Sequence, residues 1–130
     1  MGRPTTGRPS NMELAILKVL WERGPSTVRQ VMELLQEQRP VGYTTVLKIL
    51  QIMRDKALVR CDARKEPHVY RHRHQPRTIL RQLAGDLLER AFDGSARGLL
   101  LHALEHKKAS AEELDELRQL IDELEGRSRR

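Results

Sequence analysis

Side chains able to form hydrogen bonds with a polyanion gather in one short stretch, residues 42–51. It offers two hydroxyls with methyl groups, a phenol, a cation and an amide on the first turns of an amphipathic segment. On a helix, such groups match base edges in the major groove, and the phenol suits a phosphate. A merely solvated helix face is the alternative interpretation. The outward residues are Tyr43, Thr44, Thr45, Lys48 and Gln51.

Three helices must position this stretch, because helical periodicity recurs from Ser10 onward. Ser10 and Glu13 form a capping-box pattern that predicts a helix ending at Gly24-Pro25. Ser26 or Thr27 caps a second helix, which ends before Pro40. The third begins near Gly42 or Tyr43 and continues to about Lys56. Its predicted inner face is Val46, Leu47, Leu50 and Met53.

Two β-type runs follow, residues 58–62 and 68–72, with a charged turn at residues 63–67. Helices followed by such a hairpin are the outline of a winged helix-turn-helix domain, which we expect over residues 10–75. Its hairpin is the candidate wing. In this fold, the third helix enters the major groove of DNA.

Two further groups of residues are expected at the DNA. Long cations at the wing turn suit phosphates, although exposed turns are often charged for solubility alone. The start of the second helix presents free amides to anions. These candidates are Arg64, Lys65 and His68 at the wing, and Ser26, Thr27 and Arg29 at the helix start.

Charge is distributed unevenly along the 130 residues, whose formal net charge is +6. Residues 1–75 hold 14 Lys and Arg against 7 Asp and Glu, a balance of +7, and residues 76–130 hold 10 against 11, a balance of −1. Concentrated positive charge favours binding to a polyanion through counterion release. The excess therefore coincides with the predicted winged domain. Residues 1–9, rich in Gly, Pro and Arg, are expected to be a disordered basic arm.

Residues 76–130 show three amphipathic helical patterns and no strand pattern. We expect a helical dimerisation region, giving a mainly α fold with a small β-hairpin and a homodimer. The alternative is that these helices fold back onto the winged helix domain and form one monomeric core with it. The expected dimer residues are Leu80, Leu83, Leu87, Leu88, Phe92, Leu100, Leu104, Leu117, Leu120, Ile121 and Leu124.

Several other functions are disfavoured. Cys61 is the only cysteine, which argues against a disulfide framework and a thiolate metal site, and no cofactor is expected. His102, Glu105 and His106 match the H-x-x-E-H pattern of zinc peptidases, but they lie in a short leucine-rich helix without an evident third ligand. We therefore expect no enzyme. No signal peptide or membrane span is evident, which predicts a cytoplasmic protein.

Ordered blocks along nearly all of the chain after Ser10 resemble the penicillinase repressor family, the BlaI/MecI/CopY type of bacterial winged-helix repressor. The resemblance implies a homodimer with intertwined C-terminal helices that binds a pseudo-palindromic operator and blocks transcription. The matching blocks are Glu13-Leu14, Val19-Leu20-Trp21, Thr44-Thr45-Val46, Ala57-Leu58-Val59 and Ala111-Glu112-Glu113-Leu114-Asp115-Glu116-Leu117.

The resemblance also implies a means of release, and three departures qualify it. In the family, a membrane sensor-protease often cuts the repressor, and alignment puts that site near His102 and Ala103, where Asn and Phe would be expected. The paired cysteines of copper-responsive members are absent. Lys56 stands where a glycine usually ends the recognition helix. A lysine in a left-handed cap costs roughly 1 kcal/mol relative to glycine, so we expect this helix to end differently here.

The sequence thus predicts a homodimeric, sequence-specific DNA-binding repressor. Two rival functions remain: a winged-helix module that binds a protein without a specific DNA target, and, far behind, a zinc hydrolase built on the His102 segment.

Overall fold

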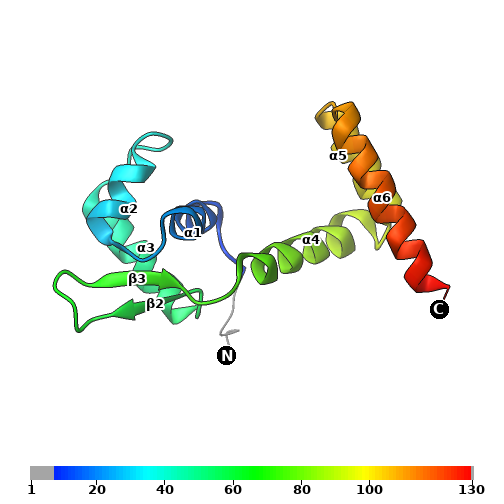
Figure 1. Ribbon diagram of the computed structural model, residues 1–130. Coiled ribbons are helices and arrows are strands. Elements are labelled where there is room, and N and C mark those ends of the chain that lie inside the picture. Colours follow the sequence, from blue (N-terminus) through cyan, green and yellow to red (C-terminus); the bar gives the residue numbers. More distant parts are fainter. Residues whose placement is uncertain (1–7, 130) are drawn as a thin grey trace. The chain divides into compact units, whose positions relative to one another are not determined.

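The computed structural model describes residues 8–129 and contains six helices and three strands within that range (Figure 1). Most of the basic arm expected at residues 1–9 lies outside it. The chain divides into two compact units, residues 1–83 and 84–130. In chain order the elements are α1 (Asn11–Arg23), β1 (Ser26–Thr27), α2 (Val28–Leu35), α3 (Tyr43–Asp55), β2 (Val59–Asp62), β3 (Val69–His72), α4 (Pro76–Phe92), α5 (Ala96–His106) and α6 (Ala111–Ser128).

Capping residues set the starts of α1 and α2. The Glu13 amide donates to Ser10 Oγ at 3.2 Å, and the Ser10 amide donates to Glu13 Oε1 at 2.9 Å, which completes the predicted capping box. Thr27 and Gln30 form the same reciprocal pair at the start of α2. Gly24 ends α1 at φ 92°, a conformation that glycine adopts without steric cost.

The hairpin is confirmed, and it gains a strand that the sequence did not predict. β2 and β3 pair antiparallel, with Cys61 opposite Tyr70. The two-residue β1 pairs with the other edge of β3, with Ser26 opposite Tyr70, so the sheet order is β1-β3-β2. Two residues are too few to show the alternation by which a strand is recognised in a sequence.

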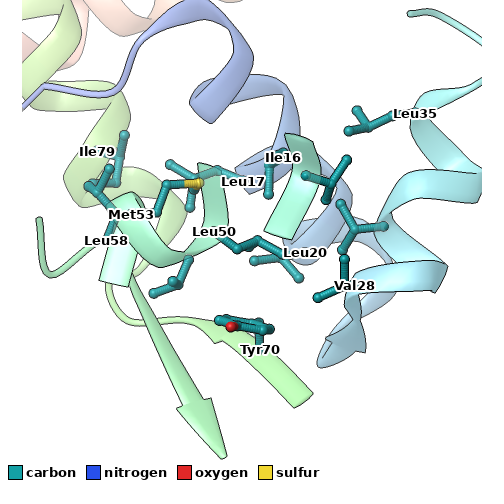
Figure 2. Packing of buried hydrophobic residues seen from close by; sticks show 13 residues of the cluster. Ile16, Leu17, Leu20, Val28, Leu35, Leu50, Met53, Leu58, Tyr70 and Ile79 are labelled. Atoms are coloured by element: carbon teal, nitrogen blue, oxygen red, sulfur yellow. The ribbon is translucent and has the colours of Figure 1, made fainter. Parts of the chain in front are cut away.

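One hydrophobic cluster joins α1, α2, α3 and the sheet. It includes Leu20 of α1, Leu50 of α3 and Tyr70 of β3, all at most 3% exposed, and Figure 2 shows their side chains. Ile79 of α4 joins the same cluster at 3% exposure, and Leu83 packs partly against it. The first turns of α4 therefore belong to the winged unit, beyond the boundary expected at residue 75.

At the end of α3 the chain avoids a left-handed conformation at Lys56. Lys56 keeps a right-handed conformation at φ −80°, and Ala57 is the left-handed residue at φ 63°. Lys56 therefore does not carry the cost of a left-handed cap. The Ala57 carbonyl accepts a hydrogen bond from His74 Nε2 at 2.9 Å, which holds this turn to the segment before α4.

The second unit consists of the remainder of α4 with α5 and α6. Asp93 at φ 49° and Gly94 at φ 81° end α4. Ser95 and Ser110 cap α5 and α6 by accepting from the amides of Gly98 and Glu113. Neither α5 nor α6 has a fully buried residue. Their apolar stripes are thus left without a core of their own.

Candidate nucleic-acid interface

A groove opens where the start of α2, one side of α3 and the base of the wing meet, with a volume of about 560 Å³. Segments far apart in the sequence supply its walls, since β1 pairs with β3 and carries the start of α2 to the wing. Five residues predicted from the sequence line it together. The lining residues are Thr27, Val28, Arg29, Tyr43, Leu47, Gln51, Arg54, Glu66, Pro67, His68 and Tyr70.

The faces of α3 divide the predicted base-contacting residues into two sets. Val46, Leu50 and Met53 are fully buried, so the helical repeat places Thr44 and Lys48 on the opposite, exposed face. Gln51 lies between that face and the groove, which Tyr43 also lines. Thr45 is exposed on the far side, in line with Ile52. Thr44, Lys48 and Gln51 thus form the central outward stripe.

The wing turn is held by a local ion pair. Asp62 Oδ1 accepts from the Arg64 amide at 3.1 Å and from Arg64 Nε at 3.2 Å. The side-chain hydrogen bond from Arg64 holds the pKa of Asp62 below its usual value. The Arg64 side chain is nevertheless 91% exposed, and Lys65 beside it is also exposed. Both cations are accessible to a phosphate, since an exposed ion pair is weak.

The structure removes Ser26 from the candidate interface. Its side chain is fully buried, and its hydroxyl donates to the Gly24 carbonyl at 2.8 Å. The hydroxyl supports the turn between α1 and α2 and has no path to a phosphate. The predicted DNA contact at Ser26 is therefore wrong, because the unpredicted strand β1 turns it inward.

Sequence reasoning missed Arg54 and Tyr70. Arg54 is exposed on α3, and it lies on the groove side because Tyr43, Leu47 and Arg54 recur at helical spacing. That spacing was present in the sequence, but the position of the groove was not. Burial and a hydrogen bond with Cys61 raise the pKa of Tyr70 to about 12, so Tyr70 remains a neutral phenol at the base of the groove.

His72 and His74 each have a structural hydrogen-bond partner. His72 Nδ1 donates to the carbonyl of His74 at 2.7 Å, and His74 donates to Ala57. In the second unit, His102 Nδ1 lies 3.6 Å from Glu105 Oε1. Within residues 8–129, no group of three His, Cys, Asp or Glu side chains is arranged to hold a metal ion.

The candidate cleavage site lies inside α5. His102 and Ala103 are both exposed and helical, and the His102 ring lies against Phe92 with centroids 5.6 Å apart. Among the residues described, no helix is long and apolar enough to cross a membrane.

Comparison with known proteins agrees with this geometry. The family described as penicillinase repressor matches residues 9–123. Over 120 residues, the chain is 38% identical to the transcriptional regulator BlaI of two Mycobacterium tuberculosis strains, covering 91% of this chain and 86% of the relative. It is 22% identical to the penicillinase repressor of Bacillus licheniformis over 92% of this chain and 94% of that protein. With a winged helix-turn-helix unit, a helical C-terminal unit and a family match over both, the chain belongs to the penicillinase repressor family of transcriptional regulators.

Proposed function

We propose that this protein is a homodimeric, sequence-specific DNA-binding repressor that works in the cytoplasm on a pseudo-palindromic operator. The observation that carries the proposal is the convergence of α2, α3 and the wing on one groove, within the half of the chain whose charge balance is +7. Two relatives are named as a transcriptional regulator and a penicillinase repressor, which supports the same role.

The residues at the interface divide by chemistry. Thr44, Lys48 and Gln51 project from the middle of the exposed face of α3, where hydrogen bonds to base edges discriminate sequence by about 1–3 kcal/mol for each good contact. Thr45 lies at the margin of this set. Cations and helix amides around the groove bind phosphates and set the register. The phosphate set is Thr27, Arg29, Tyr43, Arg54, Arg64, Lys65 and His68.

A second copy of the chain is the proposed partner of the helical unit. Leu80, Leu87 and Ile121 are each nearly half exposed, and further leucines on α5 and α6 are similarly exposed. Monomeric proteins rarely leave so many large apolar side chains in water. A two-fold dimer would cover these stripes and present two winged units to an inverted repeat.

Proteolysis within α5 is the proposed route of release, carried out by a membrane sensor-protease. A cut between His102 and Ala103 would separate Leu104 and the stripe of α6 from the rest of the dimerisation region. Because both residues are helical, the segment must unfold locally before a protease can bind it. The chain itself is proposed to have no catalytic activity.

Selection of bound duplexes from a random pool tests sequence reading. We expect inverted half-sites whose centres are separated by about 10 base pairs or a multiple of that spacing. Lys48→Ala should relax the preference at one position of each half-site, and Lys18→Ala, at an exposed position of α1, is the matched control. Uniform weak binding to every duplex would instead favour the protein-interaction module.

Sedimentation tests the dimer separately. Leu80→Asp with Leu87→Asp should halve the sedimenting mass, since charges on the shared apolar stripe prevent its burial. Leu83 is avoided because it also packs against the winged core. Leu34→Asp, at an exposed leucine of α2, should leave the mass unchanged. A double variant that keeps the wild-type mass would refute this interface.

A further inference from the structure

Two arginines lie directly opposite each other on the outer side of the wing. Arg60 of β2 pairs in register with Arg71 of β3, and both are exposed. Residues opposite one another in an antiparallel pair share a face, with Cβ atoms about 4.5–5.5 Å apart. Strand alternation places Val59 and Tyr70 on the buried side, so the two arginines face away from the core.

This outer face, defined by Arg60 and Arg71, is distinct from the groove. Tyr70 lines the groove, whereas its neighbour Arg71 lines a separate shallow depression on the other side of the hairpin. Arg60 and Arg71 are exposed, so this side of the hairpin is accessible. The lining residues of the depression are Arg60, Cys61, Asp62, Ala63, Arg64 and Arg71.

The outer face has a cost that nothing within the described chain offsets. Like charges directly opposite each other destabilise a strand pair. Asp62 supplies a carboxylate to the depression, but it is already hydrogen-bonded to Arg64. Within residues 8–129, neither Arg60 nor Arg71 forms an ion pair. Solubility alone would be served as well by charges of mixed sign.

We propose that the outer face of the wing binds the phosphate backbone of DNA flanking the operator half-site. Two adjacent guanidinium groups can each hold one phosphate in a bidentate geometry, and the charges of the two phosphates would relieve the repulsion between the arginines. Because the groove faces the half-site, the outer face contacts a different stretch of the DNA backbone. Flanking duplex that curves toward the wing provides this stretch, so no second DNA molecule is needed. This inference rests on the proposed function.

The test compares Arg60→Thr/Arg71→Thr with the wild type on two duplexes. Threonine suits an exposed strand, so the sheet should be retained. Both probes carry the operator obtained by selection, one with minimal ends and one extended by about 10 base pairs on each side, one helical turn. Affinity is measured over a series of salt concentrations. Arg97→Gln/Arg127→Gln, which removes two exposed charges from the helical unit, is the matched control.

We expect the variant to bind the short duplex within twofold of the wild type and to lose the affinity that the wild type gains from the extension. The slope of log affinity against log salt on the long duplex should fall by about 1.8 for each protomer, or 0.9 for each lost phosphate contact. The control variant should keep both the gain and the slope.

Three outcomes would overturn the inference while leaving the proposed function intact. The wild type could gain nothing from the flanks, the variant could keep the gain, or wild-type protein could bridge two short duplexes, which would assign the outer face to a second DNA molecule. Failure of the proposed function is distinguishable, because selection would then return no preferred sequence. In that case, the wild type and the Arg60→Thr/Arg71→Thr variant are compared on arbitrary duplexes of both lengths. The difference between their salt slopes still reports whether the two arginines bind phosphates.

Discussion

Lys56 Nζ lies 2.9 Å from Glu13 Oε1, joining residues 43 positions apart in the sequence. The Glu13 side chain is 6% exposed and that of Lys56 is 25% exposed. The same carboxylate oxygen accepts the amide of Ser10 in the capping box. One carboxylate therefore begins α1 and fixes the end of α3, the helix proposed to read DNA.

This pair should show strong energetic coupling. Lys56→Met leaves a nearly buried carboxylate without its cation, and we expect a loss of about 1–3 kcal/mol in the free energy of unfolding. Adding Glu13→Gln should cost less than the sum of the single changes, because no buried charge then lacks a partner. Urea denaturation of all four proteins measures the coupling. Strict additivity would mean that the contact contributes nothing.

Glycine should have opposite effects at two adjacent positions. Ala57→Gly relieves a left-handed conformation, and we expect it to raise the free energy of unfolding by about 1 kcal/mol. Lys56→Gly, although it matches the residue usual in the family, should lower stability because Lys56 is right-handed and paired to Glu13. Thermal melts of the two variants decide the matter. Stabilisation by Lys56→Gly would place the left-handed residue at 56 after all.

Tyr70 should make stability fall at high pH. Below the ordinary tyrosine pKa of 10.0 the phenol is neutral in both the folded and unfolded chain, so its contribution is intact there. As the pH rises from about 10 towards 12, the unfolded chain loses the proton first, and stability declines. The difference in phenolate absorbance between wild type and Tyr70→Phe should have its midpoint near 12. A midpoint at the ordinary value would show that the ring is solvated.

Arg64 should contribute affinity without selectivity. Arg64→Ala removes an exposed cation from the wing, so we expect weaker binding to every duplex and a salt slope smaller by about 0.9 for each protomer. Arg97→Ala on α5 controls for the lost charge. Fluorescence anisotropy across a salt series gives both values. A change in sequence preference would instead indicate that Arg64 reaches base edges.

Local patterns in the chain were enough to predict most helices, the hairpin and the apolar stripes. Capping pairs such as Ser10 with Glu13, the Gly24-Pro25 stop and the spacing of leucines act over a few residues, so their effect is visible without the fold. The family resemblance was carried by the same local blocks and was confirmed by the comparisons.

Contacts between distant segments settled the remainder. Pairing with β3 turned Ser26 into a buried residue and carried Thr27 and Arg29 to the groove, although a two-residue strand has no pattern of its own. The groove added Arg54 to the candidate interface, and packing at the end of α3 placed the left-handed residue at Ala57 rather than Lys56. Burial and strand pairing depend on which surfaces meet, and that information is spread over the whole chain.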